Sequence, residues 1–247
     1  FQIFSLGTGT GADEIKGKGK AGNKSLIKID EELGAIFKSY KDGSLCRLNP
    51  EISMDIQRKL GADLIVQMDE CTPHSAERDY TESSMYMSHR WGDRSLTAFH
   101  HTHDGTQGVY GVVQGGVYRD LREESADYTR SRPFFGTAIG GCLGGTKVHF
   151  YEILSWLPTR IHPDRPVHLL GIGKIEDIFE GVKQGMDTFD CVTPTREARH
   201  GRALMKGVPG GFINLRNSRY KDDPSPLDER LGIPCSTLYS KAYIQHL

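Results

Sequence analysis

An acidic side chain, Asp190, lies near the end of the apolar run 186–192, which is followed by a turn at Pro194 and by the basic residues Arg196 and Arg199. If the run is a buried strand, its C-terminal end is where barrel and doubly wound enzymes carry catalytic groups. The arginines after the turn would then bind phosphates beside the same opening. Such a pattern favours a nucleophilic carboxylate acting on a phosphate-bearing substrate. An aspartate that caps the turn, followed by arginines on a solvated helix face, explains this motif alone equally well.

Composition limits the class of protein. The 247 residues include 31 basic and 32 acidic side chains, so any contact with a nucleic acid must come from a local patch. The five cysteines are scattered singly, which is typical of reduced thiols rather than of a disulfide framework. No apolar run approaches the ~20 residues of a membrane span, and no signal peptide opens the sequence. We expect a cytoplasmic protein without a membrane partner.

The elements that must position Asp190 alternate along the chain. A hairpin at 26–40 and a helix that starts at Asn49-Pro50 are followed by strand-like runs at 63–68, 108–113, 137–139, 167–172 and 186–192. Helical stretches between them are 81–99, 121–128, 149–157 and 175–184. The last has Ile175, Ile178, Phe179 and Val182 on one face, which is the pattern of an amphipathic helix. This alternation predicts an α/β fold with parallel strands in one domain, 1–247.

Each predicted strand ends in polar or glycine-rich residues. These ends are Asp69 to Pro73, Gln114 to Gly116, Gly140-Gly141, Gly173-Lys174 and Asp190. The carboxyl ends of parallel strands meet at one edge of the sheet, so their recurrence predicts a binding site there.

A purine edge fits the residues at these strand ends. The carboxylate of Asp69 can accept hydrogen bonds from a ring N–H and an exocyclic amine, while the Gln114 amide and the backbone of Gly140 and Gly141 can donate to a carbonyl. Glycines let a flat ring lie against the backbone. With Asp190 as a nucleophile toward a sugar carbon and arginines for flanking phosphates, the set predicts base exchange on a nucleic acid.

Several motifs carry a resemblance to a known family. The segments MDECTP, VVQGGVYRDLR, AIGGCLGG, LLGIGK, FDCVTPTREARHG, INLRN and SKAYIQHL resemble, in order and spacing, those of the tRNA-guanine transglycosylases (queuine tRNA-ribosyltransferases). The resemblance implies a (β/α)8 TIM barrel. It implies an enzyme that removes guanine from the wobble position of certain tRNAs through a covalent aspartyl-ribosyl intermediate and inserts queuine or its prequeuine precursor.

Site residues carry over by position. Asp190 matches the nucleophile, Asp69 the acid that reads the base edge, and Phe1 an aromatic residue that stacks on the base. Further matches in the base pocket are Cys71, Gln114, Gly140, Gly141, Leu170 and Gly171, the last two forming its opposite wall. The residues that match the tRNA side are Lys174, Thr195, Arg196 and Arg199. The partners implied are tRNA and the exchanged bases, and a homo- or heterodimer stays open.

The sequence departs from the family pattern at its start and in the pocket wall. The family has a second essential aspartate in an Asp-Ser/Thr-Gly-Gly motif before the aromatic residue that Phe1 matches, and this sequence begins after it. We therefore expect a truncated chain whose barrel lacks its first strands and the general acid/base. Gly144 stands where prequeuine-using enzymes typically have Val, which favours queuine. Cys71 resembles the bacterial pattern, so the choice of base stays open.

A zinc site is a further departure. The family pattern is CxCxxC with a later histidine, which together form a closed tetrahedral site. In the segment 226–236 only Cys235 is a possible ligand, and His246 falls in a helical segment. We expect no metal or other cofactor, with 208–247 as the remnant of the zinc-binding subdomain.

Other functions stay open at this stage. The chain could be the non-catalytic partner subunit of such an enzyme, although Asp190 and the basic segment after it favour the catalytic lineage. A retaining glycosidase would use Asp69 and Asp190 as its carboxylate pair. A metal hydrolase built on His100, His101, His103 and Asp104 is less favoured, because these residues are expected in a polar loop after a helix.

Overall fold

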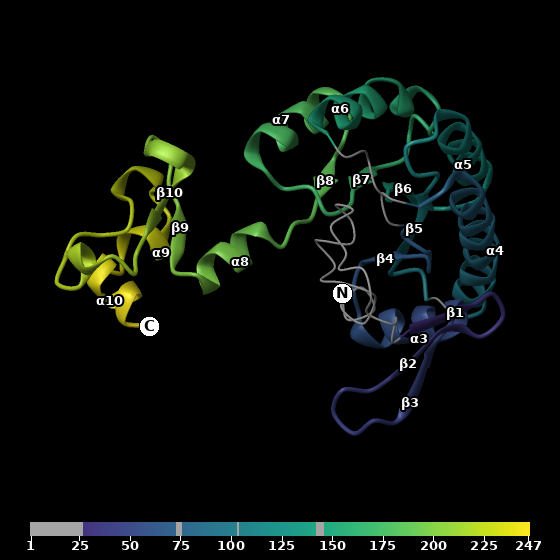
Figure 1. Cartoon of the computed structure of the whole chain (residues 1–247), viewed down its shortest axis with the longest axis horizontal. Helices are drawn as coiled ribbons and strands as arrows, with labels where there is room; N and C mark the ends of the chain where they lie inside the picture. The colour runs from purple at the N-terminus through teal and green to yellow at the C-terminus, as the bar shows by residue number, and fades with distance from the viewer. Residues whose placement is uncertain (1–26, 73–75, 103, 142–145) are drawn as a thin grey trace. The chain divides into compact units, whose positions relative to one another are not determined.

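The computed structural model describes residues 27–72, 76–102, 104–141 and 146–247 (Figure 1). The described residues form two compact units, one within Phe1–Phe189 and the other Asp190–Leu247. The predicted stacking residue Phe1 and the wall residue Gly144 lie outside the described residues.

A five-stranded parallel sheet organises the first unit. Its strands are β4 (Leu64–Val66), β5 (Gly108–Val113), β6 (Gly136–Ile139), β7 (Val167–Leu169) and β8 (Thr188–Phe189), hydrogen-bonded in chain order. Consecutive parallel neighbours joined by helices are the repeating unit of a TIM barrel, so the sheet is a half-barrel and the predicted α/β class is confirmed. Strands β7 and β8 are shorter than the predicted runs 167–172 and 186–192.

Helices connect these strands and lie along one face of the curved sheet (Figure 1). They are α4 (Arg78–Thr102), α5 (Arg119–Ser131), α6 (Lys147–Trp156), which continues into η1 (Leu157–Thr159), and α7 (Ile175–Lys183). The four predicted helices are therefore confirmed. The prediction of a loop for His100 and His101 is wrong, because both belong to the last turn of α4.

The apolar face of α7 is largely exposed, and only Ile178 on it is partly buried. Ile175, Phe179 and Val182 are 58%, 73% and 56% exposed, whereas Asp177 and Gly181 are the buried residues of this helix. Tertiary contacts bury the opposite side of the helix. Asp177 accepts a hydrogen bond from the Tyr151 hydroxyl at 2.6 Å, and Gly181 lies so close to Phe189 that a Cβ there would be 2.7 Å from the ring.

The largest hydrophobic core packs β5, β6 and β7 against the helix that follows β6. Its centre is formed by Val113, Ile139, Leu154, Leu157 and Leu169, all of which are fully buried. A parallel sheet covered on its faces reads as continuous apolar runs, which is why these strands were recognisable in the sequence.

The hairpin predicted at 26–40 is present and is joined by a third strand. Strands β1 (Ile27–Asp30), β2 (Gly34–Lys38) and β3 (Leu45–Leu48) form an antiparallel sheet in that order. The predicted helix follows as α3 (Pro50–Leu60), with the Asn49 side chain accepting from the Ile52 amide and Gly61 ending it at φ 70°.

The second unit is small and built from short elements. These are α8 (Thr193–Arg199), β9 (Arg202–Leu204), η2 (Pro209–Gly211), β10 (Phe212–Asn214), η3 (Ser218–Tyr220), η4 (Glu229–Leu231), α9 (Pro234–Thr237) and α10 (Lys241–His246). Strands β9 and β10 pair antiparallel, and Ile213, Leu215 and Tyr220 form its core.

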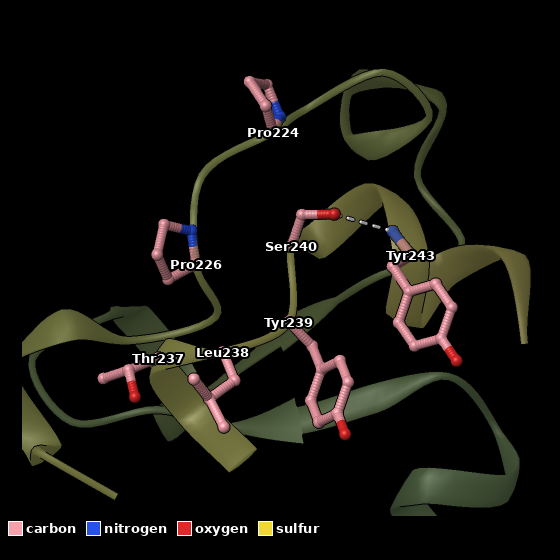
Figure 2. Close-up of a pocket in the computed structure, with 7 residues that line it drawn as sticks. All are labelled: Pro224, Pro226, Thr237, Leu238, Tyr239, Ser240 and Tyr243. Atoms are coloured by element: carbon pink, nitrogen blue, oxygen red, sulfur yellow. Dashed lines mark hydrogen bonds between the residues drawn. The ribbon is translucent and has the colours of Figure 1, made fainter. Parts of the chain in front are cut away.

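A hollow of about 350 Å³ opens on the surface of the second unit (Figure 2). It is lined by prolines 224 and 226, by residues 237–240 and by Tyr243, and the rings of Tyr239 and Tyr243 stack with centroids 5.4 Å apart. Among the described residues of the whole chain, no helix combines the length and the apolar character that a bilayer span requires.

Candidate functional site

The carboxyl ends of β4, β5 and β6 bring three predicted site residues to the same edge of the sheet. Gln114 directly follows β5, Gly140 directly follows β6, and Asp69 comes shortly after β4. The parallel register pairs Val66 with Tyr110 and Val113 with Ile139, so these strand ends lie side by side.

Asp69 and Gln114 are in direct contact. The Gln114 Nε2 donates to the Asp69 Oδ2 over 2.5 Å, and Gln114 is buried while Asp69 is partly buried. Burial raises the pKa of Asp69 to about 6, although the bond from Gln114 lowers it, and the charge of the neighbouring Glu70 also raises it. Asp69 is thus a carboxylate at neutral pH whose charge is poorly solvated, so N–H donors from a ligand would stabilise it.

The backbone of Gly140 and Gly141 lies close against neighbouring side chains at this edge. Gly141 has φ 75°, and a Cβ there would be 2.5 Å from Gln114 Oε1. A Cβ on Gly140 would be 2.8 Å from a methyl group of Val112 and 3.3 Å from Leu170 Cδ1. Both positions therefore require glycine, and Leu170 of the predicted opposite wall is beside them.

One residue of this edge was missed by the sequence analysis. Arg122 on α5 is fully buried, and its Nε donates to the Gly116 carbonyl at 2.5 Å and its Nη2 to the Gly140 carbonyl at 3.0 Å. The available signal was helical spacing, because Arg122 shares a face with Ser125, Ala126 and Thr129, which are all buried.

A second buried hydrogen-bond network, which the sequence also did not predict, holds the backbone of Gln114. The Ser125 Oγ accepts from the Gln114 backbone N–H at 3.0 Å and contacts His89 Nε2 at 2.9 Å. The His89 ring stacks on Tyr128 with centroids 4.0 Å apart, and burial lowers the pKa of His89 to about 4. The imidazole is therefore neutral at physiological pH and forms part of the scaffold.

The remaining predicted residues of the first unit lie on the β4–α4 and β7–α7 connections. Cys71 follows Asp69 and is partly buried, Gly171 has φ 74° directly after Leu170, and Lys174 is the N-cap residue of α7.

The predicted nucleophile and three of the four predicted tRNA-side residues belong to the second unit. Asp190 comes directly after Phe189, the last residue of β8. Thr195, Arg196 and Arg199 lie on α8 and are exposed, so the two guanidinium groups are accessible to a phosphate backbone.

The residues expected in place of a zinc site do not fit the metal. Cys235 is exposed at α9, and His246 ends α10. Among the described residues, no three His, Cys, Asp or Glu side chains are grouped as a metal ion requires. The absence of zinc stays a prediction.

Taken as chemistry, the edge presents a carboxylate, a carboxamide and a glycine backbone within contact distance of one another. Asp69 offers acceptors, Gln114 offers an amide, and the Gly140-Gly141 peptide offers a backbone N–H next to Gln114. This combination is complementary to a purine that carries a carbonyl next to a ring N–H.

Comparisons with known proteins identify the family of the chain. The sequence model of one family, described as queuine tRNA-ribosyltransferase, matches residues 19–247. The queuine tRNA-ribosyltransferase of Roseiflexus sp. (strain RS-1) is 41% identical over 259 residues, which cover all of this chain and 64% of that protein. Those of Acinetobacter baylyi and Pseudomonas putida are 40% and 42% identical over 248 residues, covering this whole chain and 59% and 60% of theirs.

The chain therefore spans about three fifths of the length of these curated relatives. The family match extends over the parallel sheet and the second unit alike, and it confirms the resemblance seen in the motifs. The chain belongs to the queuine tRNA-ribosyltransferase family.

Proposed function

We propose that this protein is a tRNA-guanine transglycosylase. It exchanges guanine at the wobble position of tRNA for queuine or its prequeuine precursor, as part of queuosine modification in the cytoplasm. Membership of the family supports the reaction class, and the whole activity is a proposal because the chain covers about three fifths of its relatives.

The observation that carries the proposal is the Asp69–Gln114 pair beside Gly140 and Gly141. The pKa of Asp69, raised by burial to about 6, leaves the group ionised at neutral pH in a poorly solvated place. Ring and exocyclic N–H groups of guanine would supply the missing donors. The Gly141 amide and Gln114 would donate to the carbonyl of the base.

Asp190 is proposed to act on the ribose. One carboxylate oxygen attacks C1′, the bond from C1′ to the purine nitrogen breaks, and the purine leaves with that electron pair and takes up a proton. The incoming base then attacks C1′ through its own ring nitrogen, which gives up its proton, and the C1′–O bond breaks to release the Asp190 carboxylate. Because each of the two substitutions inverts C1′, the ribose keeps its original configuration.

Residues on both units are proposed to hold the substrate. Arg196, Arg199 and Thr195 on α8, with Lys174 before α7, would bind phosphates of the anticodon stem-loop. In the base pocket, Cys71, Leu170 and Gly171 would form the walls, and Phe1 would stack on the base. Homo- or heterodimers are compatible with these roles.

We also propose that the second unit, including the remnant 208–247, holds no structural zinc. Exposed Leu231 and Ile233 and the single thiol of Cys235 occupy the segment where the family pattern has its cysteines. Elemental analysis of chelator-washed protein tests this, and one zinc per chain would refute it.

Base exchange tests the function itself. The protein is incubated with radiolabelled guanine and a tRNA that has guanine at the wobble position, with the same tRNA carrying adenine there as the control. Label should enter only the first tRNA. Competition between queuine and prequeuine then assigns the base, with queuine expected from Gly144. A protein that binds both tRNAs without any incorporation would be a non-catalytic subunit.

A further inference from the structure

Arg122 is a charged side chain enclosed in the first unit, with no exposed surface. A buried guanidinium is unfavourable unless its N–H groups are hydrogen-bonded. Its Nε donates to the carbonyl of Gly116 at 2.5 Å, and its Nη2 donates to the carbonyl of Gly140 at 3.0 Å. One rigid group therefore joins the backbone of two separate loops.

These loops are the ones that follow β5 and β6. The first begins with Gln114, and the second contains Gly141, so the same guanidinium joins the two loops that carry the proposed donors to the base carbonyl. The packing around it is close, because a Cβ on Gly141 would be 3.3 Å from Arg122 Nη2. The planar fork of an arginine spans both carbonyls, whereas the single ammonium of a lysine is a point donor.

The bond to Gly140 also fixes the direction of the next amide. In a trans peptide, the C=O of Gly140 and the N–H of Gly141 point in opposite directions, and none of the described peptide bonds is cis. Because two glycines permit many backbone conformations, this peptide needs an external contact to hold one orientation. With its oxygen bonded to Arg122, the peptide presents the Gly141 N–H on the side facing away from the guanidinium.

The charge adds a second effect. A hydrogen bond from a cation is stronger than a neutral one, and it polarises the peptide group that accepts it. The Gly141 N–H is thereby a better donor than an ordinary backbone amide.

We propose that Arg122 is a positioning residue that orients the Gly140-Gly141 peptide so that the Gly141 amide donates to the carbonyl of the bound purine. The identity of the ligand rests on the proposed function, while the orientation of the peptide does not.

The peptide orientation is tested first, without ligand. Residual dipolar couplings of the Gly141 N–H bond are measured in the wild-type protein and in Arg122→Lys, with Arg130→Lys, an exposed position on the same helix, as the control. The coupling should change in Arg122→Lys and stay the same in Arg130→Lys. An unchanged coupling in a folded Arg122→Lys protein would overturn the proposal.

Binding of two purines tests the consequence. Guanine has the carbonyl and 2-aminopurine lacks it, and any difference in their contacts with Asp69 is the same in both proteins. Arg122→Lys should weaken guanine binding about tenfold and leave 2-aminopurine unchanged. An equal loss for both purines would indicate a merely structural role and would contradict the proposal.

The outcomes separate the two proposals. If the coupling changes while the wild-type protein binds neither purine, the positioning role stands and the proposed function fails. If the Arg122→Lys protein does not fold, the test uses the wild-type protein instead. The scalar coupling across the hydrogen bond from Arg122 Nη2 to the Gly140 carbonyl is then measured. Absence of that coupling in the folded wild-type protein would overturn the proposal.

Discussion

Gln114 donates from its side-chain amide to the carboxylate of Asp69 over 2.5 Å, and this bond joins the carboxyl ends of two neighbouring parallel strands. It fixes the direction of both side chains before any ligand is present. It also leaves the partly buried Asp69 carboxylate with little solvation, and burial raises its pKa to about 6. The site is therefore formed in advance, and ligand N–H groups would replace solvation that Asp69 lacks.

Guanine binding should depend on pH through Asp69. The ligand donates N–H groups, so it binds the ionised carboxylate, which predominates above a pKa of about 6. The dissociation constant should be flat above pH 7 and rise about tenfold per unit well below pH 6, since one proton is involved. Calorimetric titration of guanine from pH 5 to 8 measures this. Asp69→Asn should bind weakly at every pH, and a wild-type affinity that stays constant down to pH 5 would contradict the assignment.

The raised pKa of Asp69 also affects the stability of the protein without ligand, with the opposite dependence on pH. Because the folded pKa of Asp69 lies above its ordinary value, the folded state binds more protons between about pH 4 and 6, and stability from this group is lost as the pH rises through that window. Asp69→Asn should therefore raise the free energy of unfolding at pH 7 by about 1–3 kcal/mol. Denaturant titrations at pH 7 check this, and a destabilised variant would show that the carboxylate is not strained.

His89 should contribute with the reverse sign. Burial lowers its pKa to about 4, so the unfolded state binds more protons between pH 4 and about 6.5. Stability from this group is present above pH 6.5 and is lost as the pH falls toward 4. Substitution by Asn should flatten that part of the profile of unfolding free energy against pH. Since Asp69 acts oppositely over an overlapping window, the profile is best measured in the Asp69→Asn background, where an unaltered slope would contradict the prediction.

Gly141→Ala should damage the base site. The new Cβ would lie 2.5 Å from Gln114 Oε1 in a backbone with φ 75°, so Gln114 must move away from Asp69. We expect guanine affinity to fall at least about tenfold and the free energy of unfolding to fall by about 1–2 kcal/mol. Gly61→Ala is the matched control, because φ there is 70° with open space around the site. An equal effect of both variants on guanine binding would refute the steric argument.

RNA affinity should depend on α8 and not on Asp69. Replacing Arg196 or Arg199 by Gln removes a phosphate contact and should reduce the slope of log affinity against log salt by about one unit. Free guanine should bind these variants as it binds the wild type. Filter binding of an anticodon stem-loop at several salt concentrations measures the slope, with the exposed Arg47→Gln as control. A slope unchanged in both α8 variants would exclude α8 as the phosphate-binding segment.

The parallel sheet was predictable because its central strands β5 and β6 are buried almost throughout and read as apolar runs, of which Gly108–Val113 was predicted with its correct bounds. Strands β7 and β8 are shorter than their apolar runs, because the backbone pairing between them ends at Leu169 and Phe189. In α7, periodicity identified the helix but not its buried side, because the contacts of Asp177 and Gly181 are tertiary.

Site residues divide in the same way. Asp69, Gln114 and the Gly140-Gly141 pair were predictable because each follows a strand, and strand order alone brings them to one edge. The supporting residues Arg122, Ser125 and His89 were not predicted, since a single arginine or histidine in a helix is usually exposed. Their burial depends on partners from other elements, which helical spacing alone does not identify.

The central claim is that Asp190 forms a covalent bond to ribose in any complete form of this protein, and it is such a form that is tested. The wild-type protein, Asp190→Asn and the exposed control Asp222→Asn are each incubated with an anticodon stem-loop that has guanine at the wobble position, then denatured and weighed by mass spectrometry. The account predicts a denaturant-resistant adduct with the mass of the protein plus the RNA less guanine in the wild type and in Asp222→Asn, and none in Asp190→Asn. An adduct that persists in Asp190→Asn would contradict it.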